Sequence, residues 1–120
     1  MREIIFRGKR VDNGEWVQGH YYGIWDKKYI LWGEHNHIPE GCEVIPETVG
    51  QYTGIEDKNG KMIFEGDLVE WRVNGRMSIG DMFFYSGWFD MRNESGIVGF
   101  DPNRGLCMVI GNIHDRKEDV

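Results

Sequence analysis

Turn-forming residues interrupt this chain at short intervals. Pairs such as Asn-Gly and Ser-Gly recur about every 8–15 residues, which leaves room for short strands but not for long helices. Short strands joined by tight turns are typical of β-sandwiches and β-barrels. Turns are predicted at Asn13-Gly14, Trp25-Asp26-Lys27-Lys28, Pro39-Glu40-Gly41, Asn59-Gly60, Asn74-Gly75, Ser86-Gly87, Ser95-Gly96 and Asn103-Arg104-Gly105.

The composition agrees with this pattern. The chain has no alanine and only three leucines, against 12 isoleucines, nine valines and 17 glycines. Alanine and leucine are the strongest helix formers, whereas β-branched and aromatic residues fit the pleated surface of a sheet. The composition therefore excludes a helical bundle or a doubly wound α/β fold and predicts a mainly β protein with antiparallel strands.

Alternating apolar residues between the turns predict the strands. They are expected at Glu3–Arg7, Glu15–Tyr22, Lys28–Trp32, Val49–Thr53, Met62–Phe64, Leu68–Val73, Met77–Tyr85, Trp88–Met91, Ile97–Phe100 and Met108–Ile113. The segment His35–Pro46 contains two prolines and a glycine and is predicted to be a long loop. At 120 residues and 14.0 kDa the chain is expected to form one domain over residues 1–120.

The net charge of −6 is spread evenly over the two halves of the chain, so a general attraction for nucleic-acid phosphates is not expected. The one basic run, formed by Arg2, Arg7, Lys9 and Arg10, is interpreted as a solvated edge strand. No apolar stretch reaches the roughly 18 residues that span a bilayer, and the first residues contain no apolar h-region or small-residue cleavage site, so no secretion signal is expected. Cys42 and Cys107 are expected to be reduced thiols in a cytoplasmic protein.

The hairpin at Asn74-Gly75 poses a conflict of register. A two-residue loop would place Met77 and Ile79 on the face opposite Val69 and Trp71. A three-residue loop with Gly75 in the left-handed conformation would bring these apolar side chains onto one face, so a bulged turn is predicted. That register would also set Arg72 opposite Arg76, where an anion or a carboxylate would relieve the like-charge repulsion.

Aromatic side chains are unusually frequent between Met82 and Phe89. Trp25, Tyr29 and Trp32 add to this excess, and most of these aromatic residues are expected to fill the core. Four consecutive large residues, Met82–Tyr85, cannot all face one core. Either this strand is covered on both faces or one face meets a partner, and a homo-oligomer interface is the simpler form of the second alternative.

The candidate chemical sites are weak. Glu34, His35, His37 and Cys42 include donors for a tetrahedral metal site, but no second ligand pair follows at a suitable spacing, so exposed loop histidines and no metal are expected. No serine or cysteine lies in an activating motif, and the glycines form no phosphate-binding loop. No catalytic residue, cofactor site or metal site is predicted, and the protein is expected not to be an enzyme.

One block of sequence is specific. Glu47-Thr48-Val49-Gly50-Gln51-Tyr52-Thr53-Gly54-Ile55, then Asp57-Lys58-Asn59-Gly60-Lys61 and Ile63-Phe64-Glu65-Gly66-Asp67-Leu68-Val69, closely resembles the signature of the YopX family of phage and prophage proteins. The flanks Arg2-Glu3-Ile4, Phe6-Arg7 and Val109-Ile110-Gly111-Asn112-Ile113-His114 resemble the opening and closing of that family. The segment from Arg72 to Arg104 has no match.

The resemblance implies a mainly β fold with an SH3-like barrel in the C-terminal half, formed by about residues 48–113 after an N-terminal β segment and loop over about 1–47. It implies a phage or prophage gene and no known reaction. The signature itself is interpreted as structural, because Asn59-Gly60 suits a tight hairpin and Asp57 can cap it. A ligand-contacting role for Tyr52, Thr53 or Asp57 is the alternative.

The function predicted from these observations is non-enzymatic binding in a phage or prophage setting, with self-association through an aromatic surface. Phage or host proteins are possible partners, and no membrane is expected. The alternative is nucleic-acid binding by an SH3-like module, an analogy that rests on the fold alone. The candidate partner-binding residues are Phe84, Trp88, Arg72 and Arg76.

Overall fold

The computed structural model describes residues 4–115, which form strands, turns and one short 3₁₀ helix and contain no α-helix. The mainly β, antiparallel architecture expected from the sequence is confirmed. The chain divides into two compact units, Met1–Tyr52 and Thr53–Val120, and the division falls within strand β5 (Gly50–Glu56).

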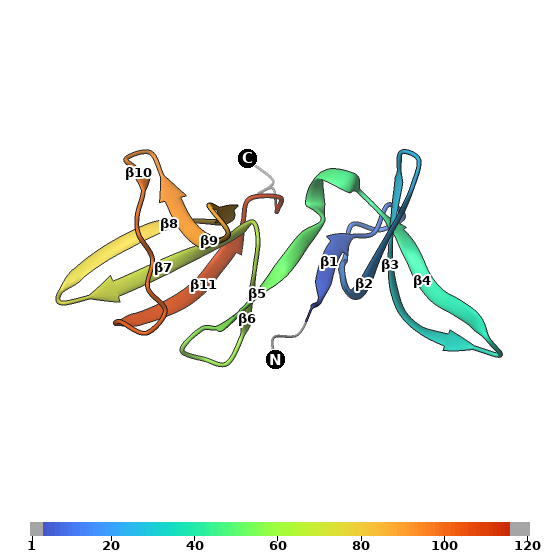
Figure 1. Cartoon of the computed structure of the whole chain (residues 1–120), viewed down its shortest axis with the longest axis horizontal. Coiled ribbons are helices and arrows are strands. Elements are labelled where there is room, and N and C mark those ends of the chain that lie inside the picture. The colour runs from blue at the N-terminus through green and yellow to red at the C-terminus, as the bar shows by residue number, and fades with distance from the viewer. Residues whose placement is uncertain (1–3, 116–120) are drawn as a thin grey trace. The chain divides into compact units, whose positions relative to one another are not determined.

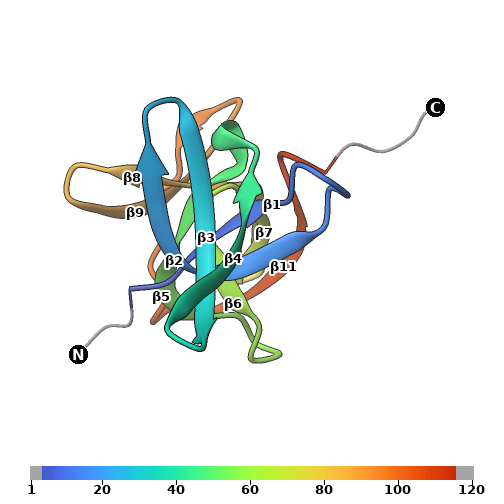
Figure 2. The same ribbon diagram turned by 90° about the vertical axis from the view of Figure 1, so that its right-hand side faces the viewer.

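Unit 1 is built from four strands and the start of β5, in the spatial order β4-β3-β2-β1-β5 with every pair antiparallel. Figure 2 shows β3 running between β2 and β4. Because β1 lies between β2 and β5, the expectation of an edge strand at the N-terminus is wrong; Arg2 and Glu3 lie outside the described residues. The elements are β1 (Phe6–Lys9), β2 (Trp16–Ile24), β3 (Lys27–His35), β4 (Ile38–Val44) and η1 (Pro46–Thr48).

The sheet of unit 1 curls until the end of its edge strand β4 meets the end of β1. Arg10, just after β1, forms an isolated bridge with Val44 at the end of β4, and the N–H of Ile45 donates to the carbonyl oxygen of Lys9 at 2.8 Å. Gly8 makes this closure possible, because a Cβ at that position would lie 2.9 Å from Cβ of Val44. Val44 and Ile30 are completely buried inside the curl.

The segment predicted as a long loop is instead a β-hairpin. Asn36 and His37 both have positive φ, 52° and 66°, which is the geometry of a two-residue type I′ turn between β3 and β4. The prediction failed because Pro39 and Gly41 weaken the strand pattern. Pro39 is tolerated because β4 is the edge strand of unit 1, where a missing backbone donor breaks no pairing.

Unit 2 contains the rest of β5 and six further strands (Figure 1). β6 (Met62–Phe64) pairs with β5, and the others form a five-stranded sheet in the order β10-β9-β8-β7-β11. Neither sheet closes in its strand order, so the SH3-like barrel predicted for this half is not confirmed. The five strands are β7 (Asp67–Val73), β8 (Arg76–Tyr85), β9 (Trp88–Asn93), β10 (Gly96–Ile97) and β11 (Leu106–Asn112).

The core of unit 2 lies on one face of the five-stranded sheet. Trp71 is its largest member; its ring meets Phe100 edge-on at a centroid distance of 5.2 Å, and its Nε1–H donates to the carbonyl oxygen of Arg104 at 2.8 Å. The polar end of the indole is therefore satisfied while its body is buried. The buried cluster consists of Ile63, Val69, Trp71, Met82, Phe89, Met91, Phe100 and Cys107.

The register of the β7–β8 hairpin differs from the prediction. Asn74 and Gly75 have φ of 52° and 78°, so Gly75 is left-handed as expected, but the turn is the plain two-residue type with Val73 opposite Arg76. Trp71 faces Ser78 rather than Met77 or Ile79, which are half-exposed on the other face.

Side-chain size explains this register. Trp71 and Val69 lie opposite the small residues Ser78 and Gly80, which leave room for the indole. Only glycine fits at the position of Gly80, because a Cβ there would collide with the carbonyl oxygen of Arg92. Matching apolar residues across β7 and β8 was therefore the wrong criterion for this hairpin, because Trp71 and Val69 pair with small residues of β8.

Candidate functional site

The end of the β8–β9 hairpin carries the densest group of exposed aromatic side chains in unit 2. Ser86 and Gly87 have φ of 53° and 87°, which defines a two-residue turn and sets Tyr85 opposite Trp88 and Phe84 opposite Phe89. Phe84, Tyr85 and Trp88 are 53%, 48% and 50% exposed. We refer to these three residues as the aromatic tip.

The aromatic tip has two faces, because successive side chains of a strand alternate. Phe84 lies on the core side, where its ring meets buried Phe89 edge-on at 5.2 Å. Phe84 therefore extends the apolar surface of the core to the exposed end of the hairpin. Of the four consecutive large residues, Met82 is buried and Phe83 is half-buried, whereas Phe84 and Tyr85 are exposed on opposite faces, so neither face is covered along the whole strand.

The second face of the hairpin presents a row of stacked groups. The rings of Tyr85 and Phe83 lie 5.6 Å apart, and the guanidinium of Arg92 sits 4.3 Å above the Phe83 ring. Nε of Arg92 also lies 3.1 Å from Oδ2 of Asp81. Arg92 is thus held by an aromatic ring and a carboxylate.

A shallow hollow of about 440 Å³ adjoins this row. Its charged side chains are Arg92, Asp81 and Glu94, of which the first two pair with each other. This arrangement suits recognition of a polar surface group. The hollow is lined by Leu68, Ile79, Gly80, Asp81, Arg92, Asn93, Glu94 and Ser95.

The two predicted arginines do not join the aromatic tip. Arg76 begins β8 and the tip ends it, so about 30 Å of extended strand separates them. Arg72 lies opposite Met77 rather than Arg76, which overturns the predicted like-charge pair. Nε of Arg72 lies 3.2 Å from Oε1 of Glu70. Of the four candidate residues, only Phe84 and Trp88 lie at the same hairpin end, where they occupy opposite faces.

The signature block serves as scaffold around Asp57. Its Oδ1 accepts hydrogen bonds from the N–H groups of Asn59 and Lys61, both at 2.9 Å, and its Oδ2 accepts one from Val109 of β11. Burial raises the pKa of the Asp57 carboxyl, but these backbone donors outweigh that effect and hold the pKa below its ordinary value. Thr53 likewise has a structural role, since its completely buried hydroxyl donates a hydrogen bond to the carbonyl oxygen of Ile63.

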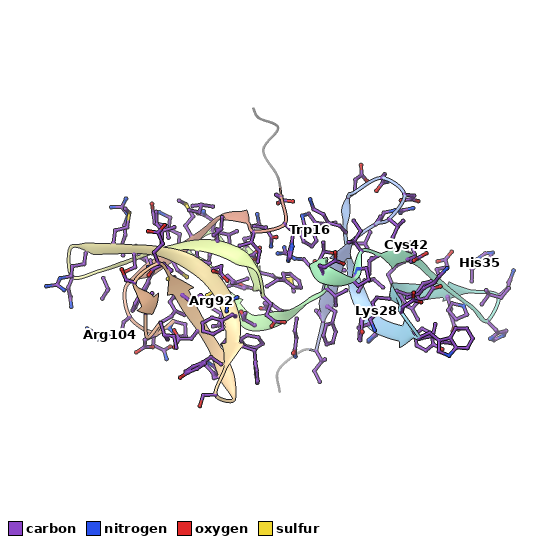
Figure 3. The ribbon with its side chains drawn as sticks, turned by 90° about the horizontal axis from the view of Figure 1, so that it is seen from above. Trp16, Lys28, His35, Cys42, Arg92 and Arg104 are labelled. Atoms are coloured by element: carbon purple, nitrogen blue, oxygen red, sulfur yellow. The ribbon has the colours of Figure 1, made fainter. Side chains whose placement is uncertain are left out.

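The histidine segment lies in unit 1 at the tip of the β3–β4 hairpin. His35 ends β3, His37 lies in the turn, and Cys42 is farther along β4 (Figure 3). Within residues 4–115 no three His, Cys, Asp or Glu side chains gather where they could hold a metal ion. Over the same residues no helix has the length and apolar character needed to span a bilayer.

Sequence reasoning misplaced two tryptophans. Most aromatic side chains were expected in the core, yet Trp25 and Trp32 are 91% and 46% exposed. Trp25 occupies the β2–β3 turn with φ of 55°. The sequence does indicate the exposure of Trp25, because Trp25-Asp26 is predicted as a turn and turn residues lie at the surface.

Comparison with known proteins identifies the family. The sequence matches the family described as YopX protein over residues 5–118. The chain belongs to the YopX family. Among solved structures, this YopX chain is similar to protein EF1440 from Enterococcus faecalis, with a TM-score of 0.58, 22% identity and 95% of each chain covered. At that identity the likeness shows the fold alone. No curated protein matches the chain.

Proposed function

We propose that this YopX protein is a non-enzymatic, phage- or prophage-encoded interaction protein of the host cytoplasm that self-associates through its aromatic tip. The supporting observation is the exposure of Phe84, Tyr85 and Trp88 at the end of one hairpin. Aromatic side chains dominate the energetics of protein interfaces, and an exposed cluster of them marks interaction sites.

The energetics favour this use of the tip. Burying two such aromatic side chains contributes on the order of 3–5 kcal/mol before the cost of association. The tight Ser86-Gly87 turn and the buried Phe89 beneath Phe84 hold the tip in place before binding, which reduces the ordering cost. A second copy of the chain is the simplest partner, because the same tip is then used twice around a twofold axis.

Equilibrium sedimentation at micromolar concentration tests the proposal. The parent chain is expected to show a mass above the 14.0 kDa of one copy, and the double variant Phe84→Ser/Trp88→Ser is expected to show 14.0 kDa. Met77→Ser is the matched control, because Met77 is also 50% exposed on β8 but lies at its opposite end. A monomeric parent chain, or dissociation by the control as well, would contradict the proposal.

Nucleic-acid binding is the second candidate, and one observation in unit 1 favours it. Arg7 and Lys9 lie over the ring of Trp16, at 4.2 Å and 5.4 Å from its centroid, which combines cations with an aromatic surface. The net charge of −6 opposes a general attraction for nucleic-acid phosphates. A mobility-shift titration is expected to show no binding of duplex DNA at ~150 mM salt. A monomer that retards DNA would reverse the ranking of the two functions.

A further inference from the structure

Unit 1 carries an apolar groove on the face of its sheet that points away from buried Ile30 and Val44. Two hollows, of about 420 and 440 Å³, share Leu31 and Pro39 and therefore lie next to each other. We call them together the β2–β4 groove. The first hollow is lined by Tyr22, Ile24, Tyr29, Leu31 and Pro39, and the second by His20, Leu31, Trp32, Gly33, Glu34 and Pro39.

Strand register builds the aromatic part of this groove. Tyr22 of β2 lies opposite Tyr29 of β3, and their rings stand 6.3 Å apart at an angle of 45°. His20 lies opposite Leu31 two residues along, on the same face. Tyr22 is 50% exposed, so its ring is available to a ligand.

A bulge in β3 brings a carboxylate to the same groove. Leu31 and Glu34 are three residues apart and would point to opposite faces of a regular strand. The pairing of β3 with β4 shifts by one between Leu31 and Gly33, so that Glu34 falls opposite Pro39. Both Leu31 and Glu34 consequently line the second hollow.

The chemistry of the lining selects one class of ligand. Aromatic rings, a proline and aliphatic side chains form a groove of the kind that receives polyproline II segments. Such a helix has three residues per turn and a rise of about 3.1 Å, so residues three apart, about 9 Å, can enter successive hollows. The described lining residues include Glu34 but no lysine or arginine, which favours a cationic ligand group and disfavours a phosphate backbone.

We propose that the β2–β4 groove binds a proline-rich peptide segment carrying an arginine or lysine. The prolines of the bound segment pack against Tyr22, Tyr29 and Pro39, and its arginine or lysine side chain pairs with the carboxylate of Glu34. This site is in unit 1 and does not depend on the aromatic tip of unit 2. The occupant is a partner's extended segment; single-stranded nucleic acid and a second copy of this chain are outcomes that the test separates.

Titration of the full chain with synthetic peptides tests the proposal. Each probe has about ten residues, with Pro-x-x-Pro repeats and one arginine at either the N-terminal or the C-terminal end. At least one is expected to bind with a Kd below ~1 mM by isothermal calorimetry, and the same peptide with glutamine for arginine is expected to bind about threefold more weakly. Failure of both arginine peptides to bind would overturn the proposal.

Two pairs of variants locate the site. Tyr22→Ala is expected to weaken peptide binding at least tenfold, whereas Tyr22→Phe keeps the ring and binds within about twofold of the parent. Ile38→Ser controls for loss of an exposed apolar group on the same hairpin, because Ile38 is 66% exposed and lines neither hollow. Equal binding by Tyr22→Ala and the parent would exclude the groove.

The carboxylate is tested separately. Glu34→Gln is expected to remove the threefold preference for the arginine peptide and leave binding of the glutamine peptide unchanged. Glu40→Gln is the matched control, since Glu40 follows Pro39 on β4 and points to the other face. Tighter binding of single-stranded oligonucleotides than of peptides, or loss of self-association in Tyr22→Ala, would assign the groove to those occupants instead.

Discussion

The carboxylate of Asp57 accepts a hydrogen bond from the backbone N–H of Val109, 2.9 Å away and 52 residues later in the chain. The next residue, Lys58, donates its own N–H to the carbonyl oxygen of Cys107. β11 is an edge strand of the five-stranded sheet, and these two bonds occupy part of its free edge. A single turn of the signature block thus both sets its own hairpin and covers a strand edge.

Replacing Asp57 is expected to destabilise unit 2 strongly. Asp57→Ala leaves the N–H groups of Asn59, Lys61 and Val109 without their acceptor, which costs about 2–4 kcal/mol of unfolding free energy. Urea denaturation measures the loss. Asp101→Ala is the control, because Asp101 accepts one exposed hydrogen bond, from Asn103, and its loss costs under about 1 kcal/mol. Equal midpoints for the two variants would refute the role assigned to Asp57.

The same carboxylate predicts a dependence of stability on pH. The pKa of Asp57 is lower in the folded chain than in the unfolded chain, so the unfolded chain binds the proton more readily as the pH falls. The contribution of Asp57 to stability is therefore complete above its pKa in the unfolded chain, about 3.9, and is lost as the pH falls through its pKa in the folded chain. Urea midpoints between pH 7 and pH 2.5 are expected to fall more steeply for the parent than for Asp57→Asn. Parallel curves would contradict this assignment.

Gly80 is expected to tolerate no side chain. In Gly80→Ala the new Cβ would meet the carbonyl oxygen of Arg92 and lie 2.7 Å from Cγ of Met91, so the β8–β9 pairing must shift at a cost of about 1–3 kcal/mol or more. Gly33→Ala is the control, because its nearest neighbour would be Oε1 of Glu40 at 3.9 Å and its φ is not positive. In thermal denaturation, Gly80→Ala is expected to unfold at a lower midpoint temperature than the parent, and Gly33→Ala at the same midpoint.

The two cysteines are expected to react at different rates. Burial raises the pKa of the Cys107 thiol, and the Asp57 carboxylate raises it further; Cys107 is 9% exposed. Burial also raises the pKa of Cys42, but Arg10 acts in the opposite direction and the residue is only half-buried. A thiol reagent at pH 8 is expected to modify Cys42 first and Cys107 only on unfolding. Cys42→Ser leaves only Cys107 to react, and Cys107→Ser leaves only Cys42. Equal rates of modification in the two variants would contradict the prediction.

Metal is expected to make no contribution to stability. The histidines of the β3–β4 tip, His35 and His37, are exposed. Thermal unfolding with and without a strong chelator is expected to give the same midpoint. A fall of several degrees in chelator would assign these histidines to a site.

The sequence alone was sufficient for the class of fold, most of the strands and the family. Short-range chemistry controls these features: Asn74-Gly75 and Ser86-Gly87 need only local backbone freedom to turn, and the absence of alanine disfavours helices wherever the strands lie. The cap by Asp57 was likewise correctly predicted, because two of its three hydrogen bonds lie within four residues, but only Gly60 of Asn59-Gly60 has a positive φ.

Tertiary structure decided what depends on neighbours distant in sequence. The place of Trp71 opposite Ser78 follows from the close approach of Gly80 to β9, which the hairpin's own residues do not reveal. Pro39 could enter a strand only because β4 lies at the sheet edge, and Glu34 shares a face with Leu31 only because of the bulge between them. Arg72 and Arg76 were separated from the aromatic tip by the length of β8. Periodicity says which side chains share a face of one strand, but register, bulges and close contacts decide which of them meet.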